Sequence, residues 1–450
     1  MRPAAGLFAV CALLAGCLVP GAALAAPTAG PGQWYISDYG IDRAWKTSTG
    51  KGVKVAVIDS GIKDSHEDLH DTVVAAKDFS GSGKDGRTPV GPEETIKHGT
   101  AVAGVIAGQG VGEGPRGVAP DAELLSASMW LGSGAPDGSS DSRTQAAQAV
   151  RWAVDKGARV INMSLGWDDP AWPESWDEAF GYAYSKDVLV VACVGNRSQG
   201  ARRAWSPATV PGVIGVGGLG RDGRVDQASS APGTSVDLMG PAQAIPVPFY
   251  QGGYAEAEGC SFAAPVVAGV AALIRSAHPD YSADQVSDVL LHSAAPVKGH
   301  KGRGTAAQPD PTVGFGRLDP LAALAASPAE HPRSAAEELA AWKTMHRRAD
   351  TAPQNTAGAS APATKAAATD TPAQAQQGRP RAVLGPVVLA SGIIAALVCA
   401  CLGLIRVRRG SGAGAGQSAR MAAEQGGIGA GSPCGRPGDG PADSRTSEEL

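Results

Sequence analysis

The sequence predicts an α/β fold with a mostly parallel central sheet, and the prediction rests on three observations. Short apolar runs rich in β-branched residues, at 53–58, 159–163 and 188–191, are typical of buried strands. Alanine-rich stretches such as 144–156 and 261–277 are typical of helices and lie between or after these runs. Strands that alternate with helices form βαβ units, whose functional groups gather at the carboxyl ends of the strands.

Composition narrows the classes of protein that this chain can belong to. Its 450 residues suffice for one large domain with accessory segments, or for two or three smaller domains. Nucleic-acid-binding proteins usually carry a basic field, whereas this chain has a formal net charge of −4. Of its 7 cysteines, Cys193 and Cys260 alone lie between residues 50 and 325, without zinc-site spacing. We therefore expect no nucleic-acid partner, no metal and no cofactor.

The first segment of the chain predicts export. Residues 1–25 combine an early Arg2, an apolar stretch and the small residues of 23–25, as a secretory signal peptide does. A lipoprotein signal with lipid attachment at Cys17 is the alternative interpretation. Under the first interpretation the mature chain starts near Ala26.

A second apolar segment, 382–405, predicts one transmembrane helix. It carries no charged side chain, and roughly 20 apolar residues are enough to cross the hydrocarbon core. The segment 406–409, which follows it, is arginine-rich, and such flanks stay in the cytoplasm. We therefore expect a single-pass cell-membrane protein with residues 26–381 outside and a disordered cytoplasmic tail at 406–450.

The remaining segments divide by composition. Residues 26–50 are expected to form an N-terminal extension and 51–327 the main folded domain. A linker is expected at 328–381, with a short helix from Ser334 to about Arg347, where Ser334 and Glu337 have capping-box spacing. The rest of the linker is mostly Ala, Thr, Pro and Gln, too polar and small to form a core, so it is expected to act as a tether.

Three polar residues follow predicted strands or begin predicted helices. Asp59 ends the first strand, where a carboxylate can orient a histidine. The alternative is an aspartate that forms a turn or caps a helix, which is a common role. His98 opens a run of small residues that suits a closely packed helix, and a structural core histidine is the alternative. Ser261 begins an apolar helix, whose first N–H groups favour a developing oxyanion, although serine is also a common N-cap residue.

Taken together, these residues resemble those of the subtilisin-like serine proteases, or subtilases. The order Asp, His, Ser, with gaps of roughly 40 and 160 residues, is that of subtilisins. The resemblance covers about residues 33–325, and 281–294 resembles the family's penultimate helix, with Ser282 and Gln285 at capping-box spacing. Three segments look like the family signatures: VAVIDSGI at 55–62, HGTAVAGVIAG at 98–108 and GCSFAAP at 259–265.

The resemblance implies a subtilisin-like three-layer fold and a serine endopeptidase that works through an acyl-enzyme. In that family's mechanism Ser261 would attack the scissile carbonyl and His98 would transfer the proton. Asp59 would hold the histidine in the required tautomer. Asn196 matches the family's oxyanion-hole asparagine and would act alongside the backbone N–H of Ser261.

The same resemblance indicates where a protein or peptide substrate would bind. Ser164, Leu165 and Gly166 resemble the family strand that pairs with the substrate backbone, and 130–134 is the candidate opposing wall. Five acidic residues follow that strand. They form either a rim that favours basic substrates or an ordinary helix start near Pro173: Asp168, Asp169, Glu174, Asp177 and Glu178.

The segment 33–45 and the C-terminal anchor resemble those of mycosins, the membrane-anchored subtilases associated with type VII secretion in actinobacteria. Mycosins often carry extra ectodomain cysteines, which this chain lacks. The resemblance implies proteolysis of type VII secretion substrates at the outer face of the membrane, with the secretion complex as a candidate partner. Two alternatives are a structural component that stabilises the complex, with proteolysis secondary, and a general degradative protease, against which the anchor argues.

Cys193 and Cys260 stand close to the two predicted oxyanion donors. If Asn196 and Ser261 serve one oxyanion, the two cysteines must lie near each other. Exported domains seldom keep reactive thiols, so a disulfide is one prediction and two buried thiols are the other. Subtilases usually have Thr where this chain has Cys260, and we expect activity to survive the exchange.

Overall fold

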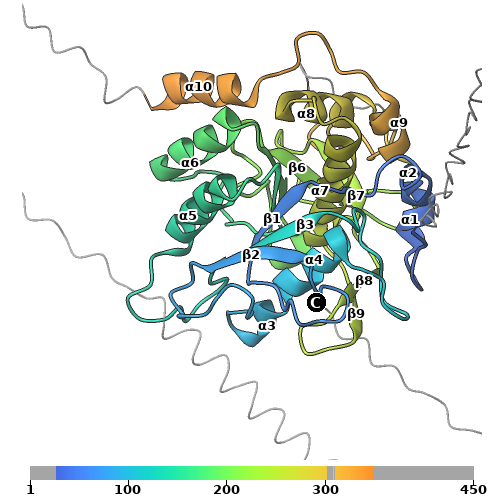
Figure 1. Cartoon of the computed structure of the whole chain (residues 1–450). Coiled ribbons are helices and arrows are strands. Elements are labelled where there is room, and N and C mark those ends of the chain that lie inside the picture. The colour runs from blue at the N-terminus through green and yellow to red at the C-terminus, as the bar shows by residue number, and fades with distance from the viewer. Residues whose placement is uncertain (1–26, 302–307, 309, 348–450) are drawn as a thin grey trace, which may run out of the picture. The chain divides into compact units, whose positions relative to one another are not determined.

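A seven-stranded sheet with the order β2-β3-β1-β4-β5-β6-β7 lies at the centre of the domain (Figure 1). The structure is a computed structural model that describes residues 27–301, 308 and 310–347. Every neighbouring pair of strands in this sheet is parallel. The strands are β1 Lys54–Asp59, β2 Val73–Asp78, β3 Glu123–Ser128, β4 Val160–Met163, β5 Leu189–Cys193, β6 Ile214–Leu219 and β7 Leu238–Pro241. An antiparallel pair follows, β8 Ile245–Pro248 and β9 Tyr254–Ala257.

Helices cover both faces of the sheet, which gives the three layers expected of a subtilisin-like fold. One face carries α1 Trp34–Asp38, α2 Ile41–Ala44, α4 His98–Ala107, α7 Cys260–Ala277, α8 Ala283–His292 and α9 Pro320–Ala325. The other carries α5 Ser142–Asp155, α6 Glu174–Ser185 and α10 Ala335–His346 (Figure 1). The short helices α3 Glu93–Ile96 and η1 Arg197–Gln199 lie in loops.

Strand β1 shows how the sequence pattern produces these layers. Successive side chains of a strand point to opposite faces. Val55 and Val57 belong to the core that contains α7, whereas Ala56 and Ile58 belong to the core that contains α5. A strand buried on both faces must be apolar throughout, which explains the uninterrupted apolar run.

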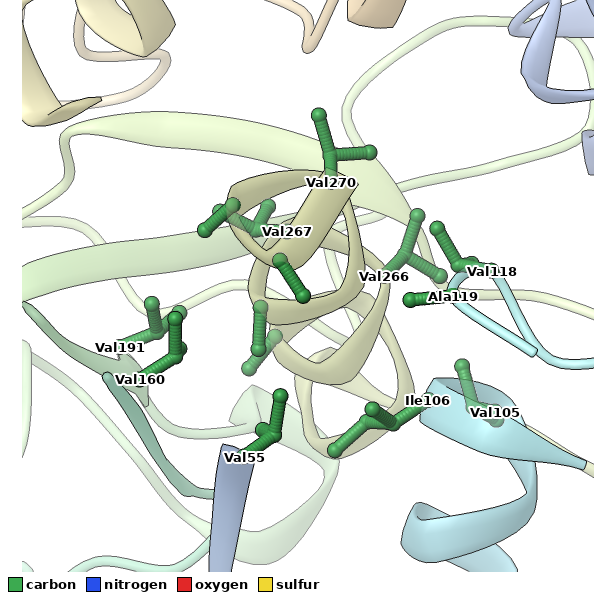
Figure 2. Close-up of a cluster of buried hydrophobic side chains, with 14 of the residues drawn as sticks. Val55, Val105, Ile106, Val118, Ala119, Val160, Val191, Val266, Val267 and Val270 are labelled. Carbon is green, nitrogen blue, oxygen red and sulfur yellow. The ribbon is translucent and has the colours of Figure 1, made fainter. Parts of the chain in front are cut away.

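Helix α7 passes through the centre of its layer (Figure 2). Val266, Val267 and Val270 lie among side chains from the strands, from α4 and from the loop that holds Val118 and Ala119. Among the described residues α7 is also the one helix long and apolar enough to cross a membrane, but 83% of it is buried within the domain. It is therefore a core helix. The expected transmembrane segment at 382–405, the signal peptide and the tail lie outside the described residues.

The secondary structure agrees with the expected elements to within one or two residues at most ends. Helix α5 starts at Ser142, two residues earlier than expected, because the carboxylate of Asp141 accepts hydrogen bonds from the N–H groups of Arg143 and Thr144. The capping box of Ser282 and Gln285 is present at the start of α8.

Residues that we expected within the linker pack against the folded domain. The side chain of Leu339 in α10 is 2% exposed. The ring of Trp342 lies 4.2 Å from that of Trp172, and Arg347 Nε lies 2.8 Å from Asp177 Oδ2. Two large apolar side chains and one ion pair thus attach a mostly polar helix to the layer of α6.

The N-terminal extension packs against the other layer. Tyr35 and Ile36 in α1 and Ile41 in α2 are fully buried. Trp34 Nε1 donates to the backbone carbonyl of Gln243 at 3.0 Å. Residues that the sequence placed outside the main domain are therefore part of its core.

Candidate active site

The residues expected from the sequence meet at one cleft of about 570 Å³. Its lining includes His98, Asn196 and Ser261, together with Ser164, Leu165 and Gly166. Asp59 is fully buried behind His98. These side chains come from the carboxyl ends of β1, β4 and β5 and from the starts of α4 and α7. In a parallel sheet such ends share one edge, which is why residues distant in sequence converge there.

Asp59 and His98 form a pair in which the Asp59 side chain is fully buried and the His98 side chain is 22% exposed. Nδ1 of His98 lies 2.9 Å from each carboxylate oxygen of Asp59. An ionised carboxylate only accepts hydrogen bonds, so Nδ1 carries the proton and Nε2 is left as a base. The backbone N–H of Ser60 donates to Asp59 Oδ1 at 2.7 Å and fixes the carboxylate.

The surroundings of His98 change its basicity. Burial lowers the pKa of His98, but the charge of Asp59 and its hydrogen bond raise it by more. The net result is a pKa above the ordinary histidine value. The ring centroid of Phe262 lies 5.6 Å from that of the imidazole, and the two rings are tilted relative to each other. His98 is thus a stronger base than a free histidine, with its orientation set by two neighbours.

Ser261 is hydrogen-bonded to Ser164, the residue that directly follows β4. Its hydroxyl donates to the carbonyl of Ser164 at 3.2 Å, and the hydroxyl of Ser164 donates to the carbonyl of Ser261 at 2.7 Å. Asn162 Nδ2 donates to Ser164 Oγ at 2.9 Å. The hydroxyl of Ser261 is thus directed at the Ser164 carbonyl in this structure.

The amide of Asn196 lies at the start of α7. Its Oδ1 accepts the N–H of Cys260 at 2.9 Å, and its Nδ2 donates to Gln199 Oε1 at 3.2 Å. Gly259, before the helix, has φ 115°, and a Cβ there would lie 3.2 Å from Asn196 Oδ1. Glycine is therefore required for this turn, and since it has no side chain of its own to cap the helix, Asn196 accepts the N–H of Cys260 instead.

A disulfide joins Cys193 to Cys260, with Cα atoms 5.2 Å apart. Of the two alternatives that the sequence left open, the structure has the bridge. The bond connects the end of β5, three residues before Asn196, to the residue before Ser261. The two predicted oxyanion donors therefore belong to covalently joined segments.

Several residues of the cleft had no signal in the sequence. Gln199 holds the Asn196 amide, and Trp205 and Glu258 also line the cleft. The cleft is also lined by Trp130, Leu131 and Gly132, which belong to the segment expected as the opposing wall. These residues lie in loops whose positions depend on tertiary packing rather than on a local pattern.

The acidic residues that follow Gly166 differ in their surroundings. Asp168 lines the cleft, whereas Asp169 pairs with Arg143 at 3.2 Å and Asp177 pairs with Arg347. Asp177 and Glu174 also occupy the first turn of α6, as the helix-start interpretation expects. In the described residues, no group of three or more His, Cys, Asp or Glu side chains is placed to hold a metal ion.

A buried aspartate paired with a histidine, in one cleft with a serine at a helix start on a parallel sheet, is the arrangement of the subtilisin-type serine endopeptidases. The profile of the subtilase family matches residues 50–316. The chain therefore belongs to the subtilase family.

Curated relatives and solved structures agree with this assignment. The chain is 36% identical over 249 residues to subtilisin E of Bacillus subtilis (strain 168), covering 55% of this chain and 61% of that protein. It is 35% identical over 237 residues to a thermophilic serine proteinase of Bacillus sp. (strain AK1), covering 52% of this chain and 55% of that protein. The matches thus span little more than half of these relatives.

Two similar solved structures are proteases of type VII secretion systems. MycP1 from the ESX-1 system superposes with a TM-score of 0.56 at 27% identity, covering 68% of this chain and 88% of that one. MycP3 from the ESX-3 system has a TM-score of 0.54 at 30% identity, covering 66% of this chain and 90% of that one.

Proposed function

We propose that this chain is a membrane-anchored extracellular serine endopeptidase that acts on type VII secretion substrates. Its catalytic residues are Asp59, His98 and Ser261. The observation that carries the catalytic part is the pairing of Asp59 with His98, which lines one cleft with Ser261 and Asn196. A protein with a purely structural role would not need all four groups together.

The reaction starts with the hydroxyl of Ser261. Nε2 of His98 takes its proton while Oγ forms a bond to the carbon of the scissile carbonyl. Asp59 stabilises the imidazolium that results. The carbonyl oxygen becomes an oxyanion, and the Asn196 amide and the backbone N–H of Ser261 donate to it. A side-chain donor of this kind lowers the barrier by about 3–4 kcal/mol.

Collapse of the tetrahedral intermediate breaks the C–N bond. The imidazolium of His98 gives its proton to the leaving amine, and the acyl group stays on Ser261 as an ester. Water then attacks the ester with the same base, and its proton returns to Ser261. The substrate chain lies extended on Ser164, Leu165 and Gly166, opposite the wall that begins at Trp130, by strand addition.

Labelling of the full-length protein with a fluorophosphonate probe tests the nucleophile. We expect Ser261→Ala to abolish labelling while the fold, measured by circular dichroism, persists. Ser276→Ala is the matched control, since Ser276 lies on the same helix and its hydroxyl donates to the backbone carbonyl of Lys51. Undiminished labelling of Ser261→Ala would assign the nucleophile to another residue.

The secretion role rests on similarity to MycP1 and MycP3 together with the sequence pattern of the chain's ends. We propose a signal peptide at 1–25, an ectodomain from 26 and a transmembrane helix at 382–405 that leaves 406–450 in the cytoplasm. Protease added to intact cells should remove the ectodomain and spare a C-terminal epitope. Digestion of that epitope in sealed cells would reverse the topology.

The structural alternative makes a different prediction for the inactive variant. If proteolysis is the function, Ser261→Ala should leave secretion substrates uncleaved while the protein stays in the membrane. Full secretion and processing with that variant would favour a role as a structural component of the complex. Genes for a secretion ATPase and small secreted helical proteins beside this one would support either secretion role against general degradation.

A further inference from the structure

The ends of β4 and β5 form the two sides of a slot beside the nucleophile. The strands are parallel, and Met163 lies opposite Ala192. Three residues further along each chain come Gly166 and Gly195, in the segments that lead to the cleft. Neither glycine has a side chain, so a residue from another segment has to fill the space between them.

The indole of Trp205 packs between Gly166 and Gly195. A Cβ on Gly195 would lie 2.7 Å from Trp205 Cδ2, and a Cβ on Gly166 would lie 3.0 Å from Trp205 Cε3. Substitution of either glycine would therefore displace the ring. The ring packs against both backbones and also lines the cleft that contains Ser261.

Hydrogen bonds hold Trp205 in this position. Its backbone N–H donates to the carbonyl of Val194 at 3.0 Å, and the next residue, Ser206, accepts the N–H of Trp167 at 3.0 Å. The segment thus bridges the extensions of β4 and β5. Trp205 Nε1 donates to Asp168 Oδ1 at 2.8 Å, which sets the orientation of the ring.

A substrate side chain has to enter this slot. The scissile carbonyl must reach both Ser261 and the Asn196 amide, while the chain before it lies on 164–166. The side chain of the residue that supplies the carbonyl then points between the two glycine segments and meets the indole. We infer that Trp205 restricts this residue to small side chains, namely Gly, Ala or Ser, and that Asp168 is a positioning residue for the ring.

The inference rests on the proposed role of Ser261, and the experiment distinguishes a failure of the inference about Trp205 from a failure of that role. Full-length protein in detergent is titrated with a fluorophosphonate, so that rates refer to functional sites. It then cleaves a peptide series that differs only in the residue before the scissile bond: Gly, Ala, Ser, Val, Leu, Phe or Lys. We expect kcat/KM for Ala to exceed that for Leu and Phe by at least about tenfold, because a filled site rejects added volume.

Variants locate the cause of this preference. Trp205→Gly should raise cleavage after Leu and Phe relative to Ala by at least about tenfold, and Trp205→Phe should give an intermediate ratio. Trp342→Ala is the matched control, since it removes an indole that packs on Trp172 outside the cleft and should leave the ratio unchanged. Asp168→Ala should lower the selectivity, whereas Asp168→Asn, which keeps an acceptor oxygen, should retain it.

Two results would overturn the inference. One is a wild-type enzyme that is labelled at Ser261 yet cleaves after Phe or Leu as fast as after Ala. The other is a folded Trp205→Gly enzyme with the wild-type ratio. Both leave the assignment of Ser261 intact, because labelling does not depend on the size of the substrate side chain. The wild-type profile decides the question even if Trp205→Gly does not fold.

Discussion

Cys193, the last residue of β5, is covalently bonded to Cys260, the first residue of α7, with their Cα atoms 5.2 Å apart. The bond joins positions separated by 67 residues in sequence. In the chain-entropy account, closing a loop of that length stabilises the fold by about 4 kcal/mol. Because the bond joins the segments that carry Asn196 and Ser261, it also holds the proposed oxyanion donors in alignment.

Reduction should therefore affect activity as well as stability. In the denatured, unreduced protein, peptides that contain Cys193 and Cys260 should carry no alkyl group, and both should carry one after reduction. Under reductant the native enzyme should lose about tenfold in kcat, since the donors lose their covalent alignment. A Cys193→Ala, Cys260→Thr double variant serves as the control, because its activity should not respond to reductant. Alkylation of both cysteines without reductant would rule the bridge out.

The raised pKa of His98 determines how activity depends on pH. The base must be neutral, so the labelling rate should fall as pH decreases through a midpoint above the ordinary value of 6.5. Asp59→Asn removes the charge that raises this pKa. It should lower the midpoint and slow labelling at the plateau by roughly 10⁴-fold.

The raised pKa of His98 also makes the stability of the fold depend on pH. Because the folded-state pKa of His98 is raised, the pair stabilises the fold fully below the unfolded histidine pKa. This contribution is lost as pH rises through the raised folded pKa. Thermal unfolding of wild type and Asp59→Asn across that range measures it. A wild-type rate midpoint at or below 6.5 would contradict the assignment of the raised pKa.

Asn196 and Gln199 should contribute unequally to catalysis. Asn196→Ala removes a donor to the oxyanion and should lower kcat about 100- to 1000-fold with little change in KM. Gln199→Ala removes a residue that holds the amide and should cost less than about tenfold. Steady-state kinetics on one peptide compares the two. An Asn196→Ala enzyme with normal kcat and a raised KM would assign the amide to substrate binding instead.

The packing of α10 predicts a stability effect far from the cleft. Asp177 is 5% exposed at its side chain and pairs with Arg347, which is 25% exposed. Arg347→Ala leaves a buried carboxylate without its cation, so the free energy of unfolding should fall by about 2 kcal/mol. Thermal unfolding should show a Tm lower by roughly 3 °C.

Met345→Ala supplies the control for this helix, since the Met345 side chain is 69% exposed and its loss should leave Tm unchanged. Equal Tm values for Arg347→Ala and wild type would mean that the ion pair between Arg347 and Asp177 contributes nothing to the stability of the fold. Activity per titrated site should stay at the wild-type level in both variants, because neither residue lines the cleft.

Much of the fold could be predicted because its signals are local. The apolar run of β1 requires burial on both faces, and Asp59 directly follows it. Ser282 and Gln285 bond within one helical turn, so their spacing alone predicted the capping box. Helix α10 was expected, but its contacts were not, because Leu339 and Trp342 stand out little in a polar, alanine-rich segment.

The sequence by itself determined which residues follow strands or begin helices, and with them Asp59, His98 and Ser261 as candidates. Periodicity, capping and turn chemistry act over a few residues and can be recognised without knowledge of the rest of the chain. Tertiary structure alone decided the pairing of Cys193 with Cys260 and the insertion of Trp205 between Gly166 and Gly195. Those contacts depend on how α7 and a distant loop pack against the ends of β4 and β5. No local pattern encodes such distances, because they arise only when the layers close around a shared core.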